Sequence, residues 1–273
     1  MKGLAFTKME GSGNDFVVIE NSPQSIVHSP QILVKKICDR KYGVGADGVL
    51  FLQRTKKADV RMRIFNADGS EAEMCGNGAR CAALLVARKT RKKALTIQTK
   101  AGLLLARVNR DSVRLKLTDP KDLKLDIKMQ IRGKEYDLDY VNTGVPHAVM
   151  EVADIDEVPV REVGRFIRHH KIFKPAGTNV DFIKVGDNGS VSLRTYERGV
   201  EDETLACGTG SVAAAIIATL NHGRTQNRGN QAVRVVTRSG DVLKVYFRAS
   251  RKKISDVWLE GSARIVFQGV VHV

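Results

Sequence analysis

Apolar and polar residues alternate at matching places in the two halves of this chain. In the first half, GADGVLFLQ (45–53) is an extended apolar segment, and VRMRIFN (60–66) alternates with a period of two. In the second half, GTNVDFIKV (177–185) and VSLRTYE (191–197) repeat the same order. Because a period of two places successive side chains on opposite faces, these segments predict β-strands.

In each half a polar, acidic turn follows the second strand, and then come a cysteine and an Ala-rich run. The runs are CGNGARCAALLVA (75–87) and CGTGSVAAAIIATL (207–220), each long enough for one buried helix. Cys75 and Cys207 are 132 residues apart (207 − 75), about half of the 273-residue chain. The same shift pairs Gly45 with Gly177, Asn66 with Arg198 and Glu71 with Glu203. The sequence therefore predicts two similar halves, each carrying one such cysteine.

The remaining patterns favour the same fold class. PQILVKKICDRKYG (30–43) predicts a short amphipathic helix. KALTIQTKAGLLLARV (93–108) and AVRVVTRSGDVLKVYF (232–247) predict strands bounded by turns. We expect an α+β protein, rich in sheet, with one dominant helix in each half.

The composition indicates an ordinary soluble protein apart from its charge. Hydrophobic residues make up 42% and charged residues 27%, and no run reaches the 18 apolar residues of a membrane span. The first residues lack the apolar core of a signal peptide, so we expect a cytoplasmic protein. The net charge of +15 gathers in ARKTRKK (87–93), IRHHKIFK (167–174) and FRASRKK (247–253). These runs lack interleaved aromatic residues and any nucleic-acid motif, which favours solvated charge over nucleic-acid binding but leaves the charge unexplained.

The four cysteines do not form a disulfide or zinc pattern, since none are spaced as C-x-x-C. Cys38 and Cys81 lie inside apolar helical segments and are expected in the core. Cys75 and Cys207 instead open their helices beside glycines. The unpaired N–H groups and the dipole of a helix N-terminus stabilise a thiolate, so a lowered pKa is expected for both thiols.

Two matched thiols suit one kind of reaction better than others. A nucleophile and its base are usually different groups, and a redox pair is usually close in sequence. Two like acid–base groups on opposite faces of one carbon suit racemisation, in which a thiolate removes the α-proton and a thiol returns one. The free N–H groups at the two glycine turns can hold a carboxylate and stabilise the developing charge.

Several longer motifs resemble one family. They are KMEGSGNDFVVIEN (8–21), FNADGSEAEMCGNGARC (65–81), NTGVPHAVM (142–150), GTNVDFI (177–183), YERGVEDETLACGTGS (196–211) and VWLEGSARIVFQG (257–269). Together they resemble the diaminopimelate epimerase family over essentially the whole chain. The pairing of MCGNG with YERG and ACGTG is specific, whereas a single C-G-x-G would be weak.

The resemblance implies a cofactor-independent isomerase that interconverts LL- and meso-diaminopimelate, in lysine and peptidoglycan-precursor biosynthesis. It implies two pseudo-symmetric domains, each a curled mixed or antiparallel sheet wrapped around a central helix, that close over the substrate. We expect the first domain at 1–118, with the C-terminal strand 263–273 returning to it, and the second at 119–262. The resemblance further implies a homodimer. The cysteine spacing argues against a metal site, and the absence of a long apolar run argues against a membrane partner.

The resemblance also assigns the site residues one by one. Cys75 and Cys207 are the implied catalytic pair, the first acting as base toward the LL isomer and the second as acid. The implied substrate-binding residues are Asn14, Asn66, Gly76, Asn77, Asn179, Glu197, Arg198, Gly208 and Thr209. His147 and Glu197 are implied to tune the protonation of the thiols. Gly48 and Val145 depart from the family, where many members carry Gln and Asn, so contacts to the distal end of the substrate are in question.

Two other interpretations stay open at this point. A proline racemase or hydroxyproline epimerase has the same two-cysteine chemistry, but typically reads M-C-G-H where this chain has Asn77, and lacks a counterpart of the Glu197–Arg198 pair. A basic binding protein could use the glycine turns for phosphate or nucleic acid. That alternative leaves the repeated cysteine turn unexplained.

Overall fold

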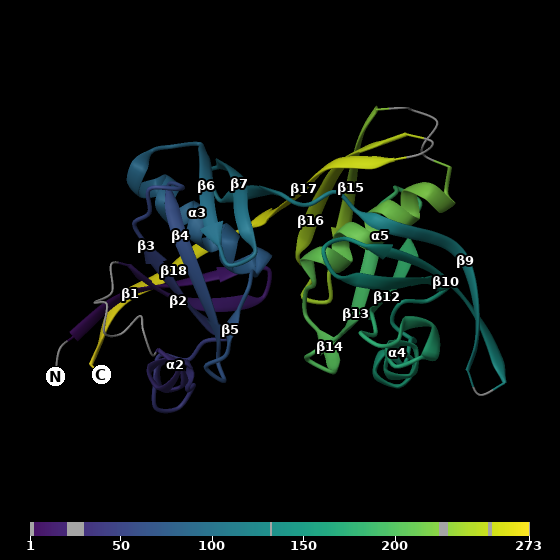
Figure 1. The fold of residues 1–273 in the computed structure, drawn as a ribbon, viewed down its shortest axis with the longest axis horizontal. Helices are drawn as coiled ribbons and strands as arrows, with labels where there is room; N and C mark the ends of the chain where they lie inside the picture. Colours follow the sequence, from purple (N-terminus) through teal and green to yellow (C-terminus); the bar gives the residue numbers. More distant parts are fainter. Residues whose placement is uncertain (1–2, 21–29, 132, 224–228, 251–252, 273) are drawn as a thin grey trace. The chain divides into compact units, whose positions relative to one another are not determined.

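The computed structural model describes residues 3–20, 30–131, 133–223, 229–250 and 253–272 (Figure 1). The chain divides into two compact units. The first is Met1–Lys116 together with Gly261–Val273, and the second is Leu117–Glu260. The sequence predicted domain boundaries at 118/119 and 262/263. Whether the two units are independent domains with these boundaries stays a prediction.

A mixed sheet forms most of the first unit. Its strands follow the order β18–β1–β2–β3–β4–β6–β7–β8, in which the β2–β3 and β4–β6 pairs are parallel and the others antiparallel. A short β5 also pairs with β4. The strands are β1 (Gly3–Gly11), β2 (Asn14–Glu20), β3 (Gly48–Gln53), β4 (Val60–Asn66), β5 (Glu71–Ala72), β6 (Ala94–Thr99), β7 (Gly102–Asn109), β8 (Ser112–Lys116) and β18 (Arg264–His272).

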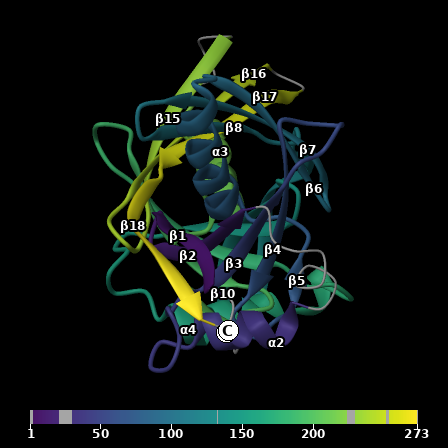
Figure 2. The same cartoon turned by 90° about the vertical axis from the view of Figure 1, so that its left-hand side faces the viewer.

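The sheet of the first unit curls around α3 (Gly76–Thr90), which contacts every strand in that order (Figure 2). Residues Asn77 to Ala87 of this helix are all buried. A helix enclosed on every side has no polar face, which explains why its sequence is a run of Ala, Gly and Leu rather than an amphipathic pattern. The helix predicted from 75–87 is therefore confirmed.

The second unit repeats this architecture around α5 (Gly208–Asn221). Its order is β9–β10–β11–β12–β13–β15–β16–β17, with β11–β12 and β13–β15 parallel, the rest antiparallel, and β14 on β13. The strands are β9 (Lys121–Ile131), β10 (Lys134–Asn142), β11 (Pro146–Glu151), β12 (Asn179–Val185), β13 (Val191–Glu197), β14 (Asp202–Thr204), β15 (Gly229–Val236), β16 (Val242–Ala249) and β17 (Ile254–Ser262).

The two units have the same succession of parallel and antiparallel pairings, which confirms the pseudo-symmetric α+β fold expected from the repeat. Strand registers therefore define equivalent positions. In the strands these positions differ by 131 residues (147 − 16 and 181 − 50), one fewer than the shift of 132 that pairs the two cysteines. Phe16 pairs with Gly48 as His147 pairs with Asn179. Leu50 pairs with Ile64 as Asp181 pairs with Thr195.

Among the residues that the structure describes, two smaller helices lie outside the sheets, α2 (Gln31–Cys38) in the first unit and α4 (Val160–Arg168) in the second. A 3₁₀ turn, η1 (Lys171–Phe173), follows α4. The helix predicted at 30–43 is confirmed as α2 but ends at Cys38. Cys38 and Cys81 are buried, as expected for core residues. Among the described residues, no helix is long and apolar enough to cross a bilayer.

The amphipathic helix α2 provides a direct test of its buried face. Ile37 is fully buried against β3 and β4 side chains, whereas Ile32 on the same helix is 74% exposed. Ile37→Ala should lower the free energy of unfolding by about 2–5 kcal/mol, because it leaves a cavity. Ile32→Ala should change it by about 0.5 kcal/mol or less. Urea unfolding of both variants measures this, and equal losses would contradict the packing.

Candidate functional site

Each of the two predicted reactive cysteines is the N-cap residue of a central helix. Cys75 caps α3 with φ −141° and ψ 122°, and Cys207 caps α5 with φ −118° and ψ 114°. Extended backbone is typical of N-cap residues, and the Cys207 side chain accepts a hydrogen bond from Gly210 N of the first turn. All four cysteines are described, and all are thiols. The helix-mouth position predicted for both cysteines is confirmed, whereas their chemical role stays a prediction.

The Cys207 sulfur is enclosed by its own helix turn. Sγ accepts a hydrogen bond from Gly210 N at 3.3 Å and lies 3.4 Å from Thr209 Oγ1. Burial raises the pKa of the Cys207 thiol, and the carboxylates of Glu197 and Asp181 raise it further, although the Thr209 and Gly210 contacts act in the opposite sense. The lowered pKa expected from the helix N-terminus is therefore wrong for Cys207, because desolvation and two carboxylates outweigh the helix.

A buried histidine–carboxylate pair lies beside this turn. His147 Nδ1 is 2.6 Å from Asp181 Oδ2, and both side chains are fully buried. Since an ionised carboxylate only accepts hydrogen bonds, the imidazole carries a proton on Nδ1 and donates it. Thr195 Oγ1 donates to Asp181 Oδ1 at 2.7 Å. Both carboxylate oxygens of Asp181 are thus satisfied by side chains of neighbouring strands.

Asn179 connects this pair to the YERG turn. Its Oδ1 accepts from Arg198 N at 2.8 Å, which fixes the orientation of the amide because a backbone N–H only donates. Its Nδ2 donates to the Pro146 carbonyl at 3.1 Å and lies 3.5 Å from His147 Nε2. The predicted residues Asn179 and His147 are therefore in one network, with their polar atoms engaged inside the second unit.

Glu197 ends β13, and Arg198 begins the turn that follows it. Burial raises the pKa of the Glu197 carboxyl and Asp181 adds repulsion, while Thr204 and His147 act in the opposite sense. The Arg198 guanidinium donates to the Ala176 carbonyl at 3.4 Å through Nη1. The structure thus brings Glu197, Arg198, Asn179, His147 and the Cys207 turn together at one end of the second unit.

The GVPH loop is attached directly to the C-G-T-G turn. Thr143 Oγ1 donates to the carbonyl of Thr209 at 3.0 Å, and Thr143 N donates to the Val145 carbonyl at 3.1 Å. Val145 thus takes part through its backbone, so its side chain is not needed for this contact. At Gly208 an added Cβ would approach Leu259 Cδ2 to 3.0 Å.

In the first unit a different network surrounds the Cys75 turn. Asn77 Nδ2 donates to Asn14 Oδ1 at 2.6 Å, and the fully buried Arg80 donates through Nη2 to Asn77 Oδ1 at 2.8 Å and to Ser12 Oγ at 2.7 Å. Asn14 Nδ2 in turn donates to Asp47 Oδ2 at 3.1 Å. The predicted residues Asn14 and Asn77 are therefore in mutual contact at the N-terminus of α3.

Charged groups on the outer side of this network hold Asn14 in place. Asp15 lies 2.7 Å from Lys8 Nζ and 2.8 Å from Arg40 Nη2, and Arg40 also contacts Asp47 at 2.8 Å. Burial alone would raise the pKa of the Asp15 carboxyl, but the Arg40 and Lys8 contacts outweigh it and hold the pKa well below its usual range. The Asp15 carboxylate is thus kept ionised, and its Oδ1 accepts a hydrogen bond from Asp47 N at 3.0 Å.

Three other positions singled out in the sequence have local explanations. Asn66 Nδ2 donates to Ser70 Oγ at 3.0 Å within a turn. A Cβ at Gly48 would lie 2.6 Å from the Phe65 carbonyl oxygen, so this backbone has no room for a side chain such as glutamine. A Cβ at Gly76 would meet no described atom within 4 Å, which leaves the first turn of α3 open to an approaching group.

Sequence reasoning missed Asp181, Arg80, Thr195 and Asp47. Asp181 could have been identified from the sequence, because polar Asn179 and Asp181 lie two residues apart, on one face of a mostly apolar strand. Arg80 could also have been identified, since it is an arginine within an apolar, buried helix. Within the part of the chain that the structure describes, no cluster of three or more His, Cys, Asp or Glu is arranged to hold a metal ion.

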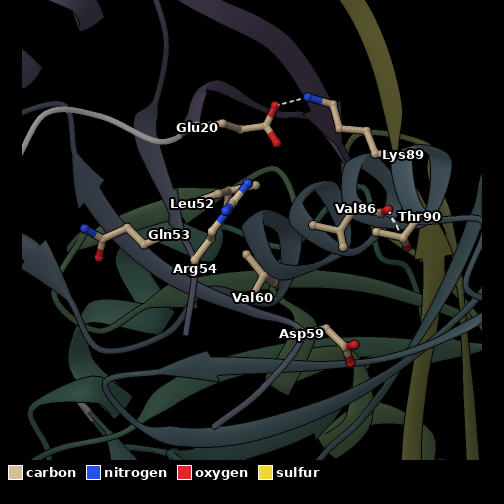
Figure 3. Close-up of a pocket in the computed structure, with 9 residues that line it drawn as sticks. All are labelled: Glu20, Leu52, Gln53, Arg54, Asp59, Val60, Val86, Lys89 and Thr90. Atoms are coloured by element: carbon tan, nitrogen blue, oxygen red, sulfur yellow. Dashed lines mark hydrogen bonds and ion pairs between the residues drawn. The ribbon is translucent and has the colours of Figure 1, made fainter. Parts of the chain in front are cut away.

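A cavity of about 150 Å³ in the first unit lies away from these residues (Figure 3). It is lined at the C-terminal end of α3 by Val86, Lys89 and Thr90, and the Lys89 ammonium pairs with Glu20 across it. Cys75 caps the opposite end of this 15-residue helix, about 21 Å away at 1.5 Å per residue. The cavity therefore contains none of the predicted site residues.

The third residue of each helix tests the difference between the two turns. A Cβ at Gly210 would lie 2.6 Å from Asp181 Oδ1, whereas at the equivalent Gly78 it would meet Leu50 Cδ2 at 3.0 Å and Ile64 Cδ1 at 3.3 Å. Gly210→Ala should displace a hydrogen-bonded carboxylate and abolish most activity, with a loss of about 100-fold or more. Gly78→Ala pushes only methyl groups that can rotate and should keep most activity. Initial rates and melting temperatures of both variants decide this, and equal activity losses would contradict it.

Comparison with known proteins places the chain in one family. The sequence model of diaminopimelate epimerase matches residues 6–121 and 139–265. Diaminopimelate epimerases from Aquifex aeolicus and Archaeoglobus fulgidus are 40% and 42% identical, covering 97% and 99% of this chain and 97% of each relative.

Solved structures show the same fold at low identity. A PhzF-family phenazine biosynthesis protein from Bacillus anthracis superposes with a TM-score of 0.77 at 18% identity, covering 100% of both chains. A hydroxyproline epimerase from Agrobacterium vitis superposes with 0.69 at 16%, covering 99% of this chain and 91% of that one. The resemblance predicted from the sequence is confirmed by the family match and the full-length relatives: this chain belongs to the diaminopimelate epimerase family.

Proposed function

We propose that this chain interconverts LL- and meso-diaminopimelate, with Cys75 and Cys207 as the two acid–base groups at one α-carbon. The observation that carries the proposal is the pair of thiols, each capping the buried central helix of one of two topologically matched units. Family membership supports the substrate. The repeat supports the chemistry, because two like groups are what proton removal from one face and return to the other require.

In the proposed reaction the Cys75 thiolate removes the α-proton of the LL isomer and the Cys207 thiol returns a proton from the other face. The reverse reaction exchanges the two roles. The raised pKa of Cys207 supports its role as the acid, because a thiol that keeps its proton near neutral pH can donate it to the carbanion.

First-turn backbone groups supply the stabilisation of the carbanion. We assign to the N–H groups of Gly76, Asn77, Gly208 and Thr209 the task of holding the reacting carboxylate, onto which negative charge is delocalised. Preorganised backbone donors of this kind contribute about 10²–10³-fold each. The open space at Gly76 supports the assignment, since a substrate can approach the backbone there.

The distal, non-reacting end of the substrate carries an ammonium and a second carboxylate. We assign its recognition to Asn14, Asn66, Asn179, Glu197 and Arg198. Arg198 suits the carboxylate, because its guanidinium can donate in pairs, and Glu197 suits the ammonium. Asn179 contributes indirectly, because its amide is spent on the Arg198 backbone and the Pro146 carbonyl.

The deciding experiment follows the α-proton of LL-diaminopimelate by NMR in D₂O under reducing conditions. Wild type should incorporate deuterium and form the meso isomer. Cys75→Ala and Cys207→Ala should each lose about 10²-fold or more in interconversion, because each removes one of the two proton-transfer groups.

Cys81→Ala is the matched control, since Cys81 lies in the same helix as the Cys75 turn but in the core. It should keep exchange while losing some stability. Proline serves as the control substrate and should not exchange. Undiminished interconversion in either Cys75→Ala or Cys207→Ala would overturn the two-thiol proposal, and exchange on proline alone would overturn the substrate.

Glu197 gives a pH-dependent prediction. Because burial raises its pKa in the folded state above that in the unfolded chain, the stability drawn from protonated Glu197 is present at low pH and is lost as pH rises through the raised pKa. Glu197→Gln removes this dependence. The stability of the variant relative to wild type should therefore grow as pH rises above about 4, the ordinary pKa of a glutamate, while its activity falls.

Urea unfolding across that pH range, together with initial rates, measures both effects. Glu203→Gln is the control, since Glu203 is paired with Arg194 at 2.7 Å on the neighbouring strand. A stability difference between Glu197→Gln and wild type that stays constant or shrinks with pH would contradict the burial argument.

We further propose a cytoplasmic homodimer. Both proposed catalytic cysteines must stay reduced, which suits a reducing compartment. Strand β18 of the first unit exposes Val266, Phe267 and Val270 next to its pairing with β1, and such apolar side chains suit contact with a second copy. Sedimentation of wild type and Phe267→Glu tests the dimer.

A further inference from the structure

The two thiol turns are equivalent in topology but not in their surroundings. The second unit places His147, Asp181 and Thr195 around the first turn of α5, while the equivalent positions of the first unit are apolar, being Phe16, Leu50 and Ile64. Burying a charged group costs folding free energy. A polar cluster present in only one of two matched cores therefore indicates a role beyond packing.

A chain of hydrogen bonds in this cluster leads to Asp181, although Asn179 Nδ2 also donates out of the chain to the Pro146 carbonyl. Arg198 N donates to Asn179 Oδ1, and Asn179 Nδ2 faces His147 Nε2. His147 Nδ1 donates to Asp181 Oδ2, and Thr195 donates to Asp181 Oδ1. Because each donor within the chain points the same way, the chain fixes one imidazole tautomer and ends on one buried carboxylate.

That carboxylate lies against the Cys207 turn. Asp181 Oδ1 is 2.6 Å, and Cys207 Cβ is 3.3 Å, from the point where a Cβ on Gly210 would stand. Gly210 is therefore a glycine because Asp181 occupies the space that a side chain would need. A carboxylate at a helix N-terminus is itself stabilised by the first-turn dipoles, and so competes with a thiolate at the same place.

We propose that Asp181 is a positioning residue of the proposed epimerase reaction: it holds His147 and the Arg198 turn in one arrangement and keeps Cys207 in its thiol form. This inference rests on the two-thiol function proposed above. It concerns the resting state of one thiol, which the presence of the cysteine pair does not determine. In the first unit no acidic residue stands at the equivalent position, since Leu50 is there. The turns that carry Cys75 and Cys207 therefore have different neighbouring side chains.

Two carboxylates in the described part of the second unit act on Cys207, Glu197 on β13 and Asp181 on β12. The neighbouring His147 on β11 contacts Asp181, and its Nε2 lies 3.5 Å from Asn179 Nδ2. Of the two carboxylates, Glu197 is assigned to substrate binding, so its effect on the protonation of Cys207 changes when substrate binds. Asp181 has both oxygens engaged by protein side chains and acts on Cys207 at every stage.

The test uses Asp181→Asn, which keeps the shape and removes the charge. With [3-¹³C]cysteine-labelled protein, the Cβ shift of Cys207, assigned with Cys207→Ser, is followed against pH. Loss of the charge should lower the titration midpoint so that Cys207 is about tenfold more ionised at a given pH, one pH unit being a factor of ten. Interconversion should fall by about tenfold or more, mainly in kcat. ¹⁵N-histidine spectra should show that His147 no longer holds a single tautomer.

Thr195→Val is the matched control, because it removes a hydrogen bond to the same carboxylate but leaves the charge. Its Cys207 midpoint should stay close to that of wild type. A midpoint in Asp181→Asn that is unchanged or higher would overturn the inference, as would equal shifts in both variants. A fold defect is detected separately by melting temperature and by the Cys38 and Cys81 shifts. Failure of the two-thiol function would show instead as undiminished activity in Cys207→Ala, so the two failures are distinguishable.

Discussion

The burial of one helix on all sides is the constraint on which each half of this structure depends. A sheet that curls around α3 or α5 leaves neither helix a polar face, so only the helix ends can carry chemistry. The first turn always has N–H groups without helical partners, and these must meet a side chain, water or ligand. At the second turn the Cys207 sulfur accepts a hydrogen bond from one of these groups, Gly210 N. The apolar run after each cysteine and the glycines around it follow from the same enclosure.

Duplicating this arrangement provides two similar thiols but does not make them chemically equal. On the first unit the turn is bordered by a buried arginine and two asparagines, and on the second by a histidine, an aspartate and a glutamate. The carboxylates of Glu197 and Asp181 favour the thiol form of Cys207. The proposed two-base reaction requires its two cysteines to rest in different protonation states, because one must remove a proton and the other must return one. The fold supplies the symmetry, and side chains at equivalent strand positions remove it.

Much of this could be predicted from the sequence, because the relevant information is local. The alternation at Val60–Asn66 and Val191–Glu197 gave the strands with their correct bounds, and the cysteine at the start of each Ala-rich run gave the helix N-caps. The direction in which the pKa of Cys207 is shifted could not be predicted in this way. The position of a cysteine in a helix is a local property. Desolvation of its thiol and the approach of Asp181 depend on which strands pair, and strand pairing cannot be predicted from one segment of the sequence. Arg80 was missed for the same reason, since its partners Ser12 and Ser262 are remote in sequence.

The glycines of the two turns show how one motif can satisfy different constraints. Gly78 and Gly210 occupy the same helical position, yet methyl groups of Leu50 and Ile64 limit the first, and the carboxylate of Asp181 limits the second. Methyl groups can rotate away from an added Cβ, but a carboxylate held by His147 and Thr195 cannot move without breaking two hydrogen bonds. The second turn is therefore the more rigid of the two. This rigidity suits the acid role proposed for Cys207, because a fixed carboxylate holds the same field on the sulfur before and after a substrate binds.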